Sequence, residues 1–302
     1  MILRRPVVLL APLLSAAALV GIAAGCSKAK PVVLIQDAAP LNVTPLATAS
    51  VAQKVNPRDL PAYSGPTGSV EGTVFVTGPV AAADGPTAYP LCKDGSAAAT
   101  YGHGFREGTA PTAGAPRWLA DAIVAITGYG SYFVPETKEA KEVVIDGCAF
   151  SARTYTLTFG QRLEVKNVSD AFWTPELDPK TTAVLMMAVP RGDSVKLFPK
   201  REGYYRLVDR DRKWATADIY VLQHPLHAVT VREGKYRIDG IPVGKVKVNA
   251  THPHLGKSEA VQDVEIKADA VAHVDLTLEN NTPPPPPPAS PSDGGVRATV
   301  IK

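Results

Sequence analysis

The stretch YYRLVDRDRKWATADIYVLQHP, residues 204–225, contains two runs of alternating apolar and polar side chains on either side of a charged segment. The first run begins one residue before this stretch and is GYYRLV at 203–208, the second is ADIYVLQ at 217–223, and the charged segment is DRDRK at 209–213. Alternation places successive side chains on opposite faces of a strand, so one face can pack inward while the other meets water. The stretch therefore predicts two strands of a half-buried sheet joined by a charged loop.

The same pattern recurs along most of the chain, with turn-forming residues between the runs. The other predicted strands lie within residues 68–79, 121–129, 142–150, 154–160, 162–168, 194–199, 228–253 and 261–279. Within the last part of the chain, Val246 and Val248 alternate with Lys245 and Lys247, as a sandwich strand requires. We therefore predict an all-β protein built from sandwiches, with a single helical turn near 136–141.

The N-terminus has the features of a bacterial export signal. Arg4 and Arg5 precede an apolar run from Val7 to Ala24, which ends in AAGC at Cys26. This ending resembles the lipobox, where the signal is cleaved before a cysteine whose thiol is then acylated. We expect residues 1–25 to be a lipoprotein signal peptide and Cys26 to be lipidated. The alternative is an uncleaved membrane anchor, because the apolar run is nearly long enough to span a bilayer.

Three further segments differ in composition from the predicted strands. Residues 26–66 are rich in Ala, Pro, Val and Thr and predict a disordered tether. Residues 81–115, rich in Gly, Ala and Thr, exceed an ordinary turn and predict a partly ordered surface insertion. Residues 281–302 include the prolines 283–288 and predict an extended, disordered Pro-rich tail.

The cysteines are informative because the predicted compartment is oxidising. With Cys26 acylated, Cys92 and Cys148 remain, and a cysteine pair outside the cytoplasm tends to form a disulfide. Two free buried thiols are the alternative. The formal net charge of the whole chain is only +3, which gives no electrostatic reason to expect nucleic-acid binding.

Residues 68–223 carry a family resemblance. The order GSVEGTVFVTGP, Cys92, ADAIVAI, IDGCAF and FGQRLEVKNVSDAFW resembles the cupredoxin-type lipoproteins and methylamine-utilisation-type proteins of bacteria. Its most specific elements are the Cys-x-Phe of Cys148 and Phe150, the turn at Gly160, and Asn167 followed by Asp170. The resemblance implies a Greek-key β-sandwich over residues 67–223.

The resemblance also implies where copper ligands would stand in a functional member of that family. The four positions are occupied here by Trp173, Asp209, Arg212 and Ala215, in place of His, Cys, His and Met. Tryptophan and alanine offer no lone pair, and arginine stays protonated, so this set does not match the thiolate and imidazole ligands of blue copper. We expect a cupredoxin framework without copper or any other cofactor.

A second resemblance begins near residue 227. The segment EGKYRIDGIPVGKVKVNATHP resembles the transthyretin-like, carboxypeptidase-regulatory-type module, through Gly234, Tyr236, Ile241, Pro242 and Gly244. Pro242 and Gly244 suit a tight turn, since proline fixes one dihedral angle and glycine accepts a positive one. The resemblance implies a small, non-catalytic β-sandwich over residues 224–280.

Two groups of side chains are candidates for ligand binding. His252 and His254 lie two residues apart, a spacing that can chelate a divalent ion, although a histidine is also usual at this strand end of the related modules. Trp173, Arg212 and Trp214 are the residue types that recognition surfaces favour, and could form a sugar- or protein-binding patch at the former copper site. The alternatives are that DRDRK is a solvated loop and that one tryptophan fills the volume left by the metal site.

The sequence shows no motif of a catalytic nucleophile or of a phosphate-binding loop, so we do not expect an enzyme. We expect an envelope lipoprotein, attached to a membrane through its lipid, that serves as a binding or structural scaffold for a protein or glycan. Ser27 favours the outer membrane, since it is not the aspartate that retains lipoproteins in the inner membrane of enteric bacteria. The alternative is an electron-transfer or metal-handling protein with an unrecognised metal site.

Overall fold

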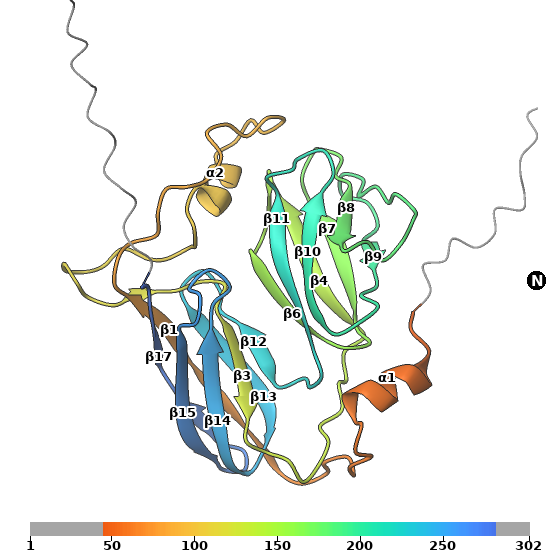
Figure 1. The fold of residues 1–302 in the computed structure, drawn as a ribbon, viewed down its shortest axis with the longest axis vertical. Coiled ribbons are helices and arrows are strands. Elements are labelled where there is room, and N and C mark those ends of the chain that lie inside the picture. Colours follow the sequence, from red (N-terminus) through yellow and green to blue (C-terminus); the bar gives the residue numbers. More distant parts are fainter. Residues whose placement is uncertain (1–44, 282–302) are drawn as a thin grey trace, which may run out of the picture. The chain divides into compact units, whose positions relative to one another are not determined.

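The computed structural model describes residues 45–281, which contain two short helices and seventeen strands (Figure 1). The helices are α1 (Thr48–Val55) and α2 (Ser96–Tyr101). The strands are β1 (Thr67–Thr77), β2 (Arg117–Trp118), β3 (Ile123–Thr127), β4 (Ala140–Asp146), β5 (Ala149–Phe150), β6 (Thr154–Thr158), β7 (Arg162–Asn167), β8 (Pro175–Asp178), β9 (Val195–Leu197), β10 (Gly203–Asp209), β11 (Thr216–Leu222), β12 (His227–Val229), β13 (Lys235–Pro242), β14 (Gly244–Thr251), β15 (Glu259–Ile266), β16 (Val271–His273) and β17 (Leu276–Glu279). The predicted all-β class is confirmed.

Strands β4–β11 form two four-stranded sheets, which we call the central sandwich. Their orders are β6-β11-β10-β8 and β5-β4-β7-β9. The alternation predicted for residues 203–208 and 217–223 is present: Tyr205 and Leu207 on β10, and Ala217 and Ile219 on β11, are buried in one core. Apolar burial on this scale is the main force holding the two sheets together.

Strands β1–β3 and β12–β17 form a second pair of sheets, which we call the composite sandwich. One sheet contains β1 with β2, β13, β16 and β17, and the other has the order β12-β3-β14-β15. On β14, Val246 and Val248 are buried while Lys245 and Lys247 are exposed, as their alternation predicts. The composite sandwich has its own core, separate from that of the central sandwich.

The strand pairing differs from the predicted division of the chain into residues 67–223 and 224–280. β1 pairs antiparallel with β13, and β3 pairs with β14, so two strands assigned to the first sandwich belong to the second. Figure 1 shows β1, in orange-brown, among the blue strands of the C-terminal part. The central sandwich is therefore inserted between β3 and β12. Alternation identifies a strand but not its distant partner, which explains the difference.

Part of the predicted disordered tether is ordered. Within residues 26–66, α1 packs Val51 and Val55 against the core of the central sandwich, and Tyr63 N–H donates to Phe133 O over 2.7 Å. Gly160 permits the approach of α1, because its φ is +102° and an added Cβ would lie 2.6 Å from Val51 Cγ1. The sequence predicted no helix in this segment, and that prediction was wrong. Contacts with the central sandwich stabilise α1, whereas its own composition does not indicate a helix.

The predicted surface insertion, residues 81–115, contributes to both cores and contains α2. Tyr101 is buried in the central core and Phe105 in the composite core. Two buried ion pairs fix its end: Arg106 binds both carboxylate oxygens of Asp121 at 2.6 Å, and Arg117 binds Glu107 at 2.6 Å. The insertion is thus a structural connection rather than a peripheral loop.

The helical turn predicted near 136–141 is absent, because Glu136 caps the backbone N–H groups of the next two residues in a non-helical turn before β4 begins. Among residues 45–281, no helix is long and apolar enough to cross a membrane. The predicted signal peptide, Cys26, the first part of the tether and nearly all of the Pro-rich tail lie outside the described residues.

Candidate functional site

The four residues that the sequence resemblance assigns to copper-ligand positions lie close together, in the interior of the central sandwich. Asp209 N–H donates to Ala215 O, and Ala215 N–H donates to Arg212 O, so the loop after β10 folds back on itself. The guanidinium carbon of Arg212 lies 4.3 Å from the centre of the Trp173 ring. Trp173 and Asp209 are 0% exposed and Arg212 is 5% exposed.

The hydrogen bonds of Asp209 show why this cluster does not fit a copper ion. Its Oδ1 accepts from the N–H groups of Asp211 and Arg212, and its Oδ2 accepts from Thr174 N–H over 2.6 Å. Arg212 lies 3.6 Å from Asp209 Oδ1 and donates to Phe172 O. Asp209 supplies the only carboxylate among these four residues, and both of its oxygens already accept hydrogen bonds. The other three side chains offer no thiolate or imidazole, so the set does not match the ligands of blue copper.

The proposed surface patch of Trp173, Arg212 and Trp214 is not present as a surface. Trp173 and Arg212 are buried, and Trp214 is half-buried with its ring edge against Tyr89 and Tyr101, at centroid distances of 5.1 and 5.6 Å. The predicted patch is absent because the stacked Trp173 and Arg212 fill the interior volume between the loops. The observed packing matches the alternative, in which a tryptophan, here Trp173, fills the interior volume.

His252 and His254 do not converge on a common point. His252 is buried beside Phe105, and its Nδ1 accepts from His254 N–H over 3.1 Å. Burial lowers the pKa of His252 to about 3. His254 extends instead toward Asp218, with 3.2 Å between Nε2 and Oδ2. The pair therefore does not form the chelate that its spacing allows.

The strongest candidate site lies on the opposite, outward face of the β10–β11 hairpin. In the antiparallel register, Tyr204 stands opposite Tyr220 and Arg206 opposite Asp218. Because strand residues two apart share a face, these four side chains and Thr216 project from the same surface. A groove of about 480 Å³ lies over them, which we call the arginine groove; its lining residues are Arg153, Tyr204, Arg206, Thr216, Asp218, Tyr220, Pro253 and His254.

Three segments that are distant in sequence build the arginine groove. β10 and β11 supply its floor, and Arg153 enters from the residue before β6, where Asp218 N–H donates to Arg153 O over 2.7 Å. His254 and Pro253 come from the β14–β15 connection of the composite sandwich. The Arg153 side chain is oriented by donation from Nη1 to His103 O over 2.6 Å.

Asp218 is the electrostatic centre of the groove. Burial raises its pKa, but hydrogen bonds from His254 and Tyr204 and the charge of Arg153 lower it by more, so the pKa lies below its ordinary value. Tyr204 Oη donates to Asp218 Oδ1 over 2.7 Å. Burial, then Asp218 and Tyr204, raise the pKa of Tyr220 to about 12. At neutral pH the groove presents two guanidinium groups, one ionised carboxylate and neutral phenols.

The sequence contains one signal for this groove. The outward residues of the two alternating runs are Tyr204 and Arg206 on the first, and Asp218 and Tyr220 on the second. Aromatic and charged residues gathered on one outward face indicate a binding surface. Their assembly with Arg153 and His254 depends on long-range packing, which a local pattern does not contain.

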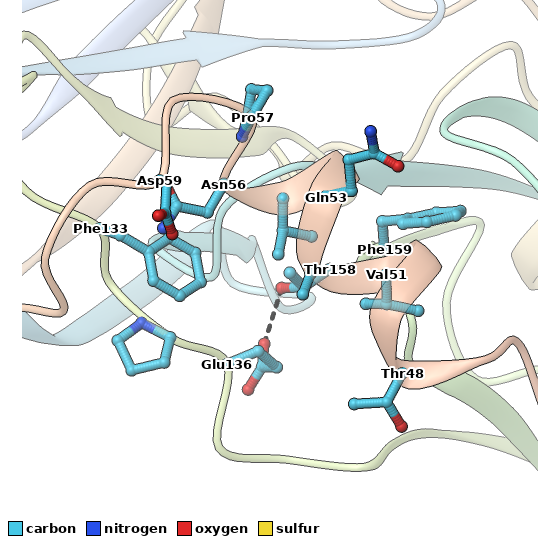
Figure 2. Close-up of a pocket in the computed structure, with 13 residues that line it drawn as sticks. Thr48, Val51, Gln53, Asn56, Pro57, Asp59, Phe133, Glu136, Thr158 and Phe159 are labelled. Carbon is cyan, nitrogen blue, oxygen red and sulfur yellow. Dashed lines mark hydrogen bonds between the residues drawn. The ribbon is translucent and has the colours of Figure 1, made fainter.

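A second cavity, of about 500 Å³, lies between α1 and the central sandwich. Figure 2 shows Val51 and Phe159 along one side, and the hydrogen bond from Thr158 Oγ1 to Glu136 Oε2, which is 2.7 Å long. Most of its accessible lining is apolar, from Val51, Phe133 and Phe159 among others. Two carboxylates line this cavity: Asp59 is exposed, and the half-buried Glu136 already accepts hydrogen bonds from Thr158 Oγ1 and from two backbone N–H groups. The cavity therefore offers less polar recognition than the arginine groove.

Comparisons with known proteins give only a distant match. No family model matches the chain, and no curated protein matches it. Among solved structures, a reduced tryptophan-to-tyrosine mutant of amicyanin covers 28% of this chain and 85% of its own, with 12% identity and a TM-score of 0.25. A methionine-to-alanine mutant of amicyanin with Cu(I) gives the same coverage and TM-score at 13% identity. These values assign the chain to no family.

Proposed function

We propose that this chain is a lipid-anchored protein of the bacterial envelope and acts as a non-catalytic binding scaffold. The central sandwich is then a cupredoxin-like framework of the methylamine-utilisation type that has lost copper, and the composite sandwich contains a carboxypeptidase-regulatory-like module. The leader ending at Cys26 supports the anchor, and the filled positions of Trp173, Asp209 and Arg212 support the loss of metal. Ser27, which is not the aspartate of inner-membrane retention, supports attachment to the outer membrane.

The observation that carries the binding function is the arginine groove. Arg153 and Arg206 outnumber the single carboxylate of Asp218, so the groove favours an anionic ligand. Guanidinium groups bind carboxylates through paired, charge-assisted hydrogen bonds. The hydroxyl groups of Thr216 and Tyr220, together with the two tyrosine rings, suit a ligand that also carries hydroxyl groups and apolar C–H faces. An acidic saccharide has all of these features.

Binding fits the groove better than catalysis because of the state of Asp218. Its two oxygens are engaged by Tyr204 Oη and by the imidazole of His254, and its pKa is lowered. A general acid or base needs a pKa close to the working pH and a free path to the reacting proton. Asp218 is instead organised as a fixed hydrogen-bond acceptor, which orients the side chains around it.

A saccharide panel tests the proposal. The full chain in detergent is screened against oligomers of galacturonic acid and, in parallel, against galactose oligomers of equal length. We expect binding of the acidic oligomers and at least tenfold weaker binding of the neutral ones, since each lost charged hydrogen bond costs about 1.5–3 kcal/mol. Equal binding of both series, or binding of neither, would contradict an acidic saccharide as the ligand.

A further inference from the structure

Cys92, Cys148 and Asp94 form a compact group of metal-ligating side chains outside the arginine groove. The two cysteines are joined by a disulfide, with their Cα atoms 5.7 Å apart. The sulfur atoms and a carboxylate oxygen of Asp94 all lie within 4.8 Å of one another. Cys92 and Asp94 belong to the insertion before α2, whereas Cys148 lies in the turn between β4 and β5.

Hydrogen bonds hold these two segments together independently of the disulfide. Ser96 Oγ accepts from Cys148 N–H over 2.8 Å, and Ser96 N–H donates to Asp94 Oδ1 over 2.8 Å. Ser96 Oγ also hydrogen-bonds the same Asp94 oxygen. Ser96 thus links the carboxylate to the backbone of Cys148, and this link does not need the sulfur–sulfur bond.

Packing fixes α2 in the same place. Ala97 is fully buried and Tyr101 nearly so, both in the core of the central sandwich. Tyr101 Oη accepts from Phe150 N–H over 3.1 Å, two residues beyond Cys148. We therefore expect the insertion to stay against β5 after reduction, which keeps the two thiols close to each other and to Asp94.

We propose that reduction of this disulfide creates a binding site for one thiophilic divalent ion, such as Zn²⁺, held by Cys92, Cys148 and Asp94. An external dithiol supplies two electrons and two protons, becomes a disulfide itself, and leaves two thiols on this chain. The ion then displaces both thiol protons and accepts one carboxylate oxygen. Two thiolates and a carboxylate are ligands that zinc binds tetrahedrally, with water or an outside ligand in the fourth position.

The exposure of the two cysteines agrees with such a use. Cys92 is half-buried and sits on the surface side, where a dithiol can attack its sulfur, while Cys148 is 8% exposed and anchored to the core. Ser96 acts as a positioning residue, since it orients the carboxylate without contacting the ion. This metal site is separate from the arginine groove, and it can be tested without any measurement of ligand binding to the groove.

The test uses the full chain with Cys26→Ser, in which the two remaining cysteines supply the only thiols. The chain is reduced with dithiothreitol, desalted without oxygen and titrated with Cd²⁺, followed by the ultraviolet charge-transfer absorption of a cadmium thiolate. We expect one equivalent to bind after reduction and none before. Asp94→Asn and Ser96→Ala should each weaken binding by roughly tenfold or more. Asp84→Asn, an exposed carboxylate of the same insertion, is the matched control.

Three results would overturn the proposal. The first is a reduced chain that shows no cadmium thiolate absorption. The second is Asp94→Asn binding as tightly as Asp84→Asn, which would leave the carboxylate without a role. The third is loss of the near-ultraviolet circular dichroism on reduction, because the segments would then separate. Unchanged circular dichroism with one bound equivalent supports the site.

Discussion

Arg212 stacks on Trp173 inside the central sandwich, with 4.3 Å from the guanidinium carbon to the ring centre, and the charge of Arg212 is balanced by the buried Asp209. A cation and an aromatic ring attract each other more strongly when both are removed from water. The three side chains therefore stabilise the loops as a group, in the interior position that the sequence resemblance assigns to a metal.

Removal of the Arg212 charge should destabilise the fold strongly. Arg212→Met keeps most of the side-chain volume but leaves Asp209 buried without its cation, which typically costs about 3 kcal/mol or more. The double variant Asp209→Asn with Arg212→Met should recover part of that loss. Urea denaturation measures the free energy of unfolding of the single and double variants. The control is Arg210→Met, which replaces an exposed arginine of the same loop. Equal stability of the two Met variants would contradict a buried charge pair.

Asp121 should be required to hold the insertion in place. It has a φ of +63° and binds Arg106 through both oxygens, while its Oδ1 also accepts from Arg153 N–H over 2.9 Å. Asp121→Asn retains a residue that tolerates positive φ but removes the charge. We expect a loss of about 3 kcal/mol in unfolding free energy and faster proteolysis within residues 81–115. Asp84→Asn should leave the cleavage rate unchanged; equal cleavage of both variants would argue against this role.

Stability should fall as the solution becomes acidic below pH 6.5. Burial, and then His224 and two lysines, lower the pKa of His227 to about 3, and burial lowers that of His252 to about 3. A histidine with a depressed pKa is protonated first in the unfolded chain, so its contribution is complete above about pH 6.5 and is lost as the pH falls toward 3. Each imidazole should contribute a slope of about 1.4 kcal/mol per pH unit in that window.

Single variants separate the two imidazoles. His227→Asn and His252→Asn should each lower the slope of unfolding free energy between pH 6 and 4 by about 1.4 kcal/mol per pH unit, as measured by denaturation at several pH values. His273→Asn removes an exposed imidazole and serves as the control variant. A slope that is the same in all three variants would mean that neither buried histidine is responsible.

A pair of glycines isolates the contact between α1 and the central sandwich. Gly160 and Gly203 both have a φ of +102°, so alanine causes similar backbone strain at either position. An added Cβ at Gly160 also collides with Val51, whereas at Gly203 it only approaches Arg201 Nη1 at 3.7 Å. Gly160→Ala should therefore speed hydrogen exchange in α1, and Gly203→Ala should not. Val51→Ala combined with Gly160→Ala should restore slow exchange; failure to do so would remove the contact as the cause.

Local sequence pattern predicted the class of the fold but not its connectivity. Alternation correctly placed Tyr205, Ile219 and Val246 on the buried faces of their strands, because burial of one face is a property of each strand alone. The pairing of β1 with β13 joins segments more than 160 residues apart, and several partners would have satisfied the same alternation. Topology of this kind depends on which cores fill best, which periodicity does not express.

For the candidate site, too, the sequence indicated local features but not long-range packing. The resemblance assigned Trp173, Asp209 and Arg212 to one site, and in the structure Arg212 contacts both of the others. Their aromatic and charged character suggested a surface, whereas all three are buried. Arginine side chains are rarely buried, so sequence alone does not indicate that Arg212 is buried. Its burial is explained by the structure, which places Asp209 and the Trp173 ring beside it. The arginine groove needs His254 from another sandwich, which no local reading of residues 204–225 could supply.

The most direct measurement is a calorimetric titration of the full chain with trigalacturonate and with its methyl ester, for the wild type, Arg206→Gln and the exposed control Arg210→Gln. Arg206 lines the groove and Arg210 does not. We predict that wild type and Arg210→Gln bind the acid at least about tenfold more tightly than the ester, and that Arg206→Gln loses this preference. Retention of the full preference by Arg206→Gln, or no binding of the acid by the wild type, would contradict it.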